Sequence, residues 1–109
     1  MIIARRELTL DLGNAKPIVA VEISAPELRR GAWICDFSVG WPDGPDRAST
    51  AGADSAQALY LAFQKVAVCL YASAYHKAGK LVWDQPGGGY GFILPSGSRH
   101  FSIGTDKKL

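Results

Sequence analysis

The stretch that decides the fold runs from Asp54 to Gly79 and reads DSAQALYLAFQKVAVCLYASAYHKAG. Apolar residues recur in it at intervals of three and four positions, which is typical of a helix with one face on a protein core. Asp54 or Ser55 offers a side-chain oxygen to the first backbone N–H groups, and Gly79 readily takes the left-handed conformation that ends a helix. The sequence therefore predicts one long helix over about residues 55–77.

The segments on both sides of this helix have strand character. Leu8, Leu10 and Leu12 alternate with polar residues, as in a half-buried strand, and the β-branched segment 18–23 follows after a turn. Further strands are expected at residues 32–39, 47–51, 80–84 and 90–94, with a last edge strand at 99–103. Four strands, a helix and two strands in this order predict an α+β domain, in which an antiparallel sheet of five to six strands carries the long helix on one face.

Length and composition bound the possible functions. The chain has 109 residues, of which 48% are hydrophobic and 20% charged, and its formal net charge is +2. We expect a single domain over residues 1–109 with one core and a frayed tail at 104–109. The charge is too small to indicate nucleic acid or a membrane surface as a partner. The chain shows neither a signal-peptide pattern nor the ~18 apolar residues of a membrane span.

The two cysteines, Cys35 and Cys69, lie on different predicted elements. Two cysteines form no disulfide framework, and their spacing is not that of metal ligands. We interpret them as reduced thiols in the core of a cytoplasmic protein, with a single bridge between them as the alternative.

The predicted helix is apolar on two sides. One stripe is expected to lie on the sheet, and it consists of Leu59, Ala62, Phe63, Val66, Cys69, Leu70, Ser73 and Ala74. The opposite side carries further apolar and aromatic residues, which are our interface candidates: Tyr60, Leu61, Gln64, Val68, Tyr71 and Tyr75. A second copy of the chain or another protein would cover such a surface. Alternatively, segment 40–52 or the C-terminal segment folds over it.

Several residues and stretches resemble parts of chemical motifs but lack the context or the spacing that these motifs require. The glycine-rich stretch 87–91 looks like a phosphate-cradling loop, but a strand ending at 92–95 follows it instead of the helix that such loops open. We therefore interpret it as a hairpin loop, with Gly91 bending the strand. His76 and His100 have no partner at a spacing typical of catalysis or metal binding. The sequence thus indicates no catalytic, cofactor-binding or metal-binding residues.

Three aromatic residues are the candidates for a ligand pocket. Trp33, Trp83 and Tyr90 come from predicted strands on both sides of the helix, so they could line a pocket between the sheet and the helix. Aromatic residues of a small sheet domain are also ordinary core and cross-strand partners. The pocket is therefore our alternative hypothesis.

Four segments resemble one known family. They are ARRELTLD at residues 4–11, WICDF at 33–37, ADSAQALYLA at 53–62 and GFILP at 91–95. With these segments the chain resembles a family of small uncharacterised bacterial proteins that is grouped as a domain of unknown function. The resemblance spans most of residues 4–95 and implies an α+β domain from the bacterial cytosol. It carries over no catalytic residue and no ligand.

The sequence predicts a class of function but no specific activity. We expect a small cytoplasmic, non-enzymatic protein that acts as a homodimer or binds a protein partner through the outer helix face. The alternative is a module that binds a small ligand in the aromatic pocket. We expect no cofactor.

Overall fold

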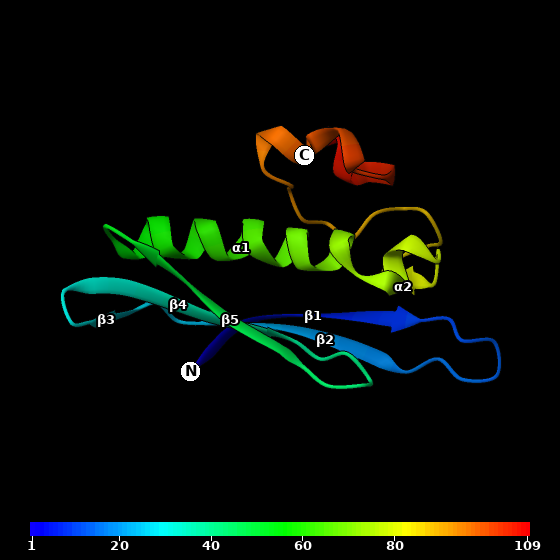
Figure 1. Cartoon of the computed structure of the whole chain (residues 1–109), viewed down its shortest axis with the longest axis horizontal. Coiled ribbons are helices and arrows are strands. Elements are labelled where there is room, and N and C mark those ends of the chain that lie inside the picture. Colours follow the sequence, from blue (N-terminus) through cyan, green and yellow to red (C-terminus); the bar gives the residue numbers. More distant parts are fainter.

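An antiparallel sheet of six strands forms the base of the structure, a computed structural model that describes residues 1–109 (Figure 1). The strands are β1 (Ile2–Leu10), β2 (Ile18–Ser24), β3 (Glu27–Arg29), β4 (Ala32–Val39), β5 (Asp46–Gly52) and β6 (Leu81–Val82). A long helix, α1 (Ser55–Ala72), packs on this sheet. The predicted α+β class is therefore confirmed, although five strands precede the helix and only one follows it.

Local chemistry sets the ends of the helices. The Asp54 side chain accepts a hydrogen bond from the Gln57 N–H at 2.8 Å, so α1 begins where the sequence predicts. The Ser73 hydroxyl donates to the Leu70 carbonyl and accepts from the His76 N–H. Ser73 thereby ends α1 and starts a second short helix, α2 (Ala74–Lys77), which is a break that the sequence did not indicate. Neither helix has the length and the apolar content that crossing a bilayer requires.

Three strands, β3, β5 and β6, lie at edges of the sheet. β5 pairs along almost the whole of β4, whose other side is shared by β2 and β3. β6 pairs only with the end of β1, at Thr9 and Leu10. β3 was not predicted because it is only three residues long and is joined to β4 by a tight turn. Arg30 and Gly31 both have positive φ in this turn, which is typical of a two-residue hairpin.

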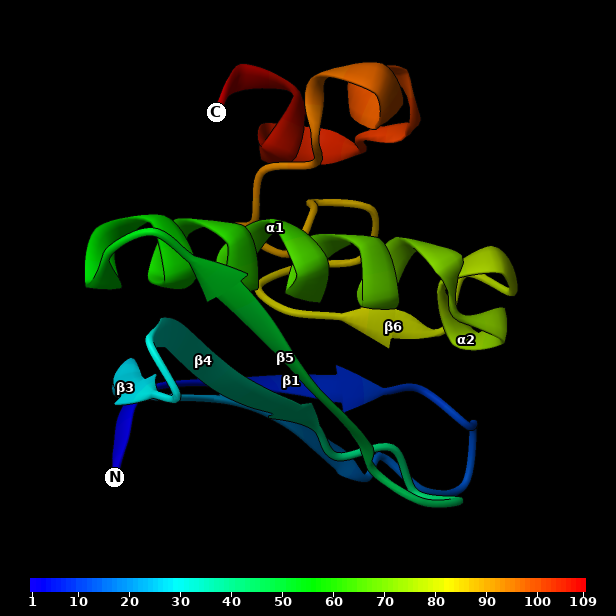
Figure 2. The same cartoon turned by 60° about the vertical axis from the view of Figure 1, so that its left-hand side comes forward.

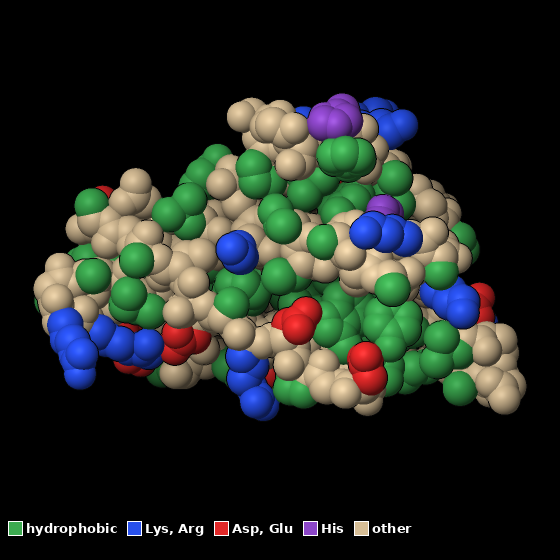
Figure 3. All heavy atoms as spheres, viewed as in Figure 1, with side chains coloured by type: hydrophobic (Ala, Val, Ile, Leu, Met, Phe, Trp, Pro, Cys, Tyr) green, Lys and Arg blue, Asp and Glu red, His purple; other side chains and the backbone are tan.

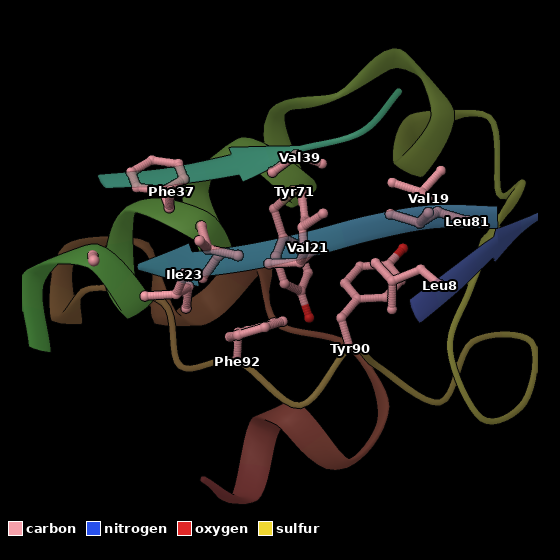
Figure 4. Close-up of a cluster of buried hydrophobic side chains, with 14 of the residues drawn as sticks. Leu8, Val19, Val21, Ile23, Phe37, Val39, Tyr71, Leu81, Tyr90 and Phe92 are labelled. Atoms are coloured by element: carbon pink, nitrogen blue, oxygen red, sulfur yellow. The ribbon is translucent and has the colours of Figure 1, made fainter. Parts of the chain in front are cut away.

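The core lies between the sheet and two different covers. α1 packs over β4 and β5 and contributes Ala62, Val66 and Leu70 from the predicted stripe. Tyr90 and Phe92 join the same core beside the residues of β1 and β2 (Figure 4). The sheet is thus wider than one helix can cover, and the chain beyond the helix completes the core.

That chain forms less sheet than the sequence predicts. The expected strand at residues 90–94 is wrong, because Gly91 has a φ of +76° and turns the backbone out of the extended conformation. The carbonyls of Tyr90 and Gly91 accept hydrogen bonds from the Arg6 side chain and not from a neighbouring strand.

Residues 95–109 form a segment that we call the C-terminal arm. It contains two short 3-10 helices, η1 (Ser96–Phe101) and η2 (Gly104–Lys108), on the side of α1 that faces away from the sheet (Figures 1 and 2). The expected edge strand at 99–103 and the expected frayed tail at 104–109 are therefore both wrong. Asp106 is fully buried and hydrogen-bonded, which holds the end of the chain in place.

Candidate functional site

One buried carboxylate ties the C-terminal arm to the rest of the domain. Asp106 Oδ2 accepts hydrogen bonds from the Tyr71 hydroxyl at 2.6 Å and from the Tyr90 N–H at 2.8 Å. Its Oδ1 accepts from the Gly91 N–H at 2.7 Å. We call these three donors the carboxylate nest. Hydrogen bonds to an ionised acceptor are about twice as strong as neutral ones, and successive backbone N–H groups are a common way to hold an anion.

A cation stands on the other side of the same backbone. Arg6 reaches from β1 and donates from one guanidinium nitrogen to the carbonyls of Tyr90 and Gly91, at 3.1 and 3.0 Å. Its guanidinium lies 4.0 Å from the centre of the Trp83 ring, a cation–π contact. Burial lowers the pKa of Arg6, and the nearby Asp106 carboxylate opposes that shift. The Tyr90–Gly91 peptide group is thus polarised between a positive and a negative charge, because its carbonyl accepts from Arg6 and its N–H donates to Asp106.

Glycines make this arrangement possible. Gly89 and Gly91 both have positive φ, and a Cβ at Gly89 would lie 2.6 Å from Asp106 Oδ1. A Cβ at Gly91 would lie 2.6 Å from the Trp83 ring. The interpretation of this stretch as a hairpin loop is therefore corrected. The glycine-rich stretch does hold an anion, but the anion is a carboxylate of the same chain, and no helix N-terminus takes part.

A second polar pair lies beside the nest. His76 Nδ1 is 2.5 Å from the Tyr90 hydroxyl, and the ring of His76 lies 4.6 Å from that of Tyr71. Burial raises the pKa of Tyr90 to about 12, so this hydroxyl keeps its proton. Burial lowers the pKa of His76, and the neighbouring Lys77 adds to that effect. The lowered pKa favours the neutral imidazole, and its tautomer sets whether Nδ1 accepts from the Tyr90 hydroxyl or donates to it.

A hollow opens between the helices and the C-terminal arm. Its volume is about 440 Å³, and its lining is mostly apolar. The lining residues are Val68, Tyr71, Ala72, His76, Lys77, Leu94, Ser98 and Phe101. The neutral His76 ring and the ammonium of Lys77 are the polar groups that the helices contribute. Such a lining suits a small apolar molecule with one acceptor group.

The six interface candidates divide into two sets. Tyr71 is buried beneath the C-terminal arm, and Tyr75 stacks on Trp41 with ring centres 5.2 Å apart. Both tyrosines are therefore covered by their own chain. The covering segments are the C-terminal arm and segment 40–52, which were the predicted alternatives to a partner chain. Tyr60 is 60% exposed, Val68 is 37% exposed, and Leu61 and Gln64 are half-buried. In Figure 3 hydrophobic side chains extend along the helix up to the arm.

The accessible candidates adjoin the edge strand β5. A second hollow of about 260 Å³ lies between the two elements. It is lined by Thr50 and Ala51 of β5, by Leu61, Gln64, Lys65 and Val68 of α1, and by Pro95. The outer side of α1 and the free edge of the sheet therefore form one continuous surface.

The three pocket candidates do not come together. Trp33 lies on β4 and packs against the core, whereas Trp83 follows β6 at the opposite edge of the sheet. Trp83 is covered by the Arg6 guanidinium, and the Tyr90 hydroxyl is occupied by His76. The space between sheet and helix is filled by the core, so the expected aromatic pocket is not formed there.

Comparison with known proteins identifies the family. A family model described as a domain of unknown function, DUF6968, matches residues 4–94. The chain belongs to this family. No curated protein and no solved structure matches it. The DUF6968 match ends at Leu94, so it contains Arg6, Tyr71, Tyr90 and Gly91 but not Asp106.

Sequence reasoning missed the two charges of the site. Asp106 stands in a short polar segment near two lysines and has the pattern of a solvated tail. Arg6 occupies an inward position of β1, between the half-buried Ala4 and the buried Leu8, where an apolar residue is expected. The usable signal was that single exception to the alternation, together with the two glycines that flank Tyr90.

The carboxylate nest should contribute measurably to stability. Replacement Tyr71→Phe removes one donor from the buried Asp106 and one acceptor from the Ile103 N–H. We expect the free energy of unfolding in urea to fall by about 1–3 kcal/mol. The matched control is Tyr75→Phe, because the Tyr75 hydroxyl donates only to the exposed Asp43, and it should change stability by less than about 0.5 kcal/mol. Equal losses in the two variants would contradict the role of the nest.

The His76–Tyr90 pair should make stability depend on pH. The pKa of His76 is lowered in the fold, so between that value and its ordinary value the unfolded chain binds more protons than the folded one. The contribution to the free energy of unfolding is therefore complete above about pH 6.5 and decreases as the pH falls below it. His76→Asn should flatten this decrease in chemical denaturation, whereas His100→Asn, on the exposed part of the arm, should retain it. Parallel curves for the wild type and His76→Asn would refute the assignment.

Proposed function

We propose that the protein is a non-enzymatic interaction module that forms a homodimer through the edge of β5 and the adjoining side of α1. The observation that carries the proposal is the free edge of β5. This strand pairs with β4 over all of its seven residues and has no strand on its other side. A free edge presents a row of backbone N–H and C=O groups that a further strand can pair with.

Apart from the charges of Asp46 and Arg47 at its start, the edge lacks the usual features that prevent such pairing. β5 contains no proline and no lysine, and its register with β4 is regular, without a bulge. Its central side chains, Ala48 to Ala51, are small and allow another strand to approach. The strand is also exposed over most of its length.

A second copy of this chain is the occupant that the edge fits. If two β5 strands pair antiparallel about Ser49, Arg47 of one copy lies opposite Ala51 of the other, and Asp46 lies opposite Gly52. No two like charges then face each other across the pair. Antiparallel pairing of identical strands is a two-fold contact, which is the commonest symmetry of soluble oligomers.

The side of α1 supplies the apolar part of the interface. Leu61 and Val68 border the hollow above β5, and the largely exposed Tyr60 lies on the same helix. A copy paired through β5 would bring its own helix beside this surface. Interfaces are enriched in tyrosine and depleted in charged residues at their centres, and this surface contains one lysine, Lys65.

The oligomeric state tests this proposal. Light scattering coupled to size-exclusion chromatography should give twice the chain mass of 11.7 kDa for the wild type. Leu61→Glu places a charge in the interface and should give a monomer with an unchanged circular dichroism spectrum. The matched control is Leu28→Glu, because Leu28 is 60% exposed on β3, away from β5, and it should remain dimeric. A wild-type monomer, or equal behaviour of the two variants, would overturn the proposal.

We also propose a cytoplasmic location in a bacterial cell. Cys35 is buried and Cys69 half-buried, and both thiols are free. Burial raises the pKa of both thiols, which keeps them protonated and unreactive. Free buried thiols are typical of proteins from a reducing compartment. The bacterial source rests on the family resemblance.

Binding of a small ligand is the second candidate function, and the hollow between the helices and the arm favours it. If a small apolar molecule with an acceptor group binds there, it should raise the Tm of the wild type in a ligand screen. Ala72→Trp fills the hollow from α1 and should abolish the shift, because Ala72 is exposed and lines that hollow. A shift that persists in Ala72→Trp would place the ligand elsewhere, and the absence of any shift would remove this candidate.

A further inference from the structure

The groups that hold the buried carboxylate and the carboxylate itself come from different parts of the chain. Tyr71, Tyr90 and Gly91, together with Arg6, lie within the family domain at residues 4–94. Asp106 lies in the C-terminal arm, beyond the family match. The domain therefore contains a complete set of donors for a carboxylate, and the arm supplies the acceptor.

The arm is attached through very few residues. All of its hydrogen bonds to the domain involve Ile103, Thr105 and Asp106. The Thr105 N–H and hydroxyl both donate to the Gly88 carbonyl at 3.0 Å, and the Ile103 side chain packs against the core. No strand pairing joins the arm to the sheet, and η1 is largely exposed. A contact of this kind resembles a bound peptide more than a part of the core.

The geometry points to a peptide receptor: we propose that residues 4–94 bind peptide segments with an apolar residue three positions before an aspartate, and that the arm occupies this receptor in cis. The Ile103-x-x-Asp106 spacing of the arm is the pattern that the receptor recognises. The aspartate enters the carboxylate nest, and the apolar residue packs beside Tyr71. A partner protein with the same pattern binds by displacing the arm.

Charge selects a carboxylate over its neutral amide. Arg6 is half-buried and makes no salt bridge, and it binds the carbonyls of the same two residues whose N–H groups hold the Asp106 carboxylate. The nest itself has only donors directed at the ligand, so an asparagine amide would place N–H against N–H. Without a carboxylate, the Tyr90 and Gly91 N–H groups and the Arg6 charge lose their partner, which favours binding of another anion of the same shape.

The arm competes with any external peptide. A tethered segment has an effective concentration in the millimolar range, so the intact protein binds a free peptide weakly. A change that releases the arm increases the fraction of receptors that are unoccupied. The apparent affinity for a free peptide rises by the same factor. This effect gives the proposal a quantitative test in the full-length chain.

The first experiment uses Asp106→Asn in the full-length protein. The probe is a fluorescent peptide with the sequence of residues 95–109, and fluorescence anisotropy measures its binding. We expect at least about tenfold tighter binding to Asp106→Asn than to the wild type. The control probe is the same peptide with asparagine in place of its aspartate, and it should bind neither protein. Equal binding of the two probes would overturn the selection for a carboxylate.

A second variant releases the arm without altering the nest or the carboxylate. Gly104 has a φ of +55°, and a Cβ there would collide with the Gly88 carbonyl group. Gly104→Val should therefore expel the arm and give the same gain in peptide binding as Asp106→Asn. Adding Tyr71→Phe to either variant should weaken the gain, because it removes one donor of the nest.

If the arm variants do not bind the peptide, circular dichroism distinguishes the two possible reasons. If both arm variants keep the spectrum of the wild type but bind no peptide, the receptor does not exist. If both lose the helix and the sheet together, the arm is a permanent part of the core, and the proposal is likewise overturned. Repeating the titration in the Leu61→Glu background separates it from dimerisation, since the nest and the β5 edge share no residue.

Discussion

The structure depends on the backbone of Tyr90 and Gly91, which is held between the half-buried charge of Arg6 and the buried charge of Asp106. Arg6 binds their carbonyls from the sheet side, and Asp106 binds their N–H groups from the arm side. Either charge alone would be costly to bury, because burial removes it from water. Together they polarise the Tyr90–Gly91 peptide group from both sides and compensate each other. This arrangement fixes the chain that covers β1 and β2, and so completes the core beside the helix.

The same arrangement explains why α1 is apolar on two sides. One side lies on β4 and β5, and the other faces the arm at Tyr71. Beyond the break at Ser73, Tyr75 of α2 is covered by Trp41. The side nearest β5, around Tyr60 and Leu61, remains accessible. The surplus of apolar residues on the helix therefore has two causes: part of it is covered by the chain itself, and part remains for the dimer that we propose.

Hydrophobic periodicity predicts the elements whose conformation depends on residues close in sequence. It fails for segments whose conformation depends on residues far away in the chain. The alternation in β1 and β2 and the cap at Asp54 each depend on neighbours in sequence, and the structure has all three. Residues 90–94 also have the composition of a strand, but a strand needs a partner edge. Arg6, eighty-four residues away from Tyr90, takes the carbonyls that such pairing would use. No pattern within a short window contains that competition.

The sequence by itself determined the α+β class, the antiparallel sheet and the position of the long helix, because hydrophobic period and capping are local properties. Only the tertiary structure decided that the tail is ordered, that Tyr71 is buried, and that the glycine-rich stretch holds a carboxylate. These features arise when Arg6, Tyr71 and Asp106 meet in space. The free energy of a buried charge depends on that meeting and not on the residues beside it in the chain.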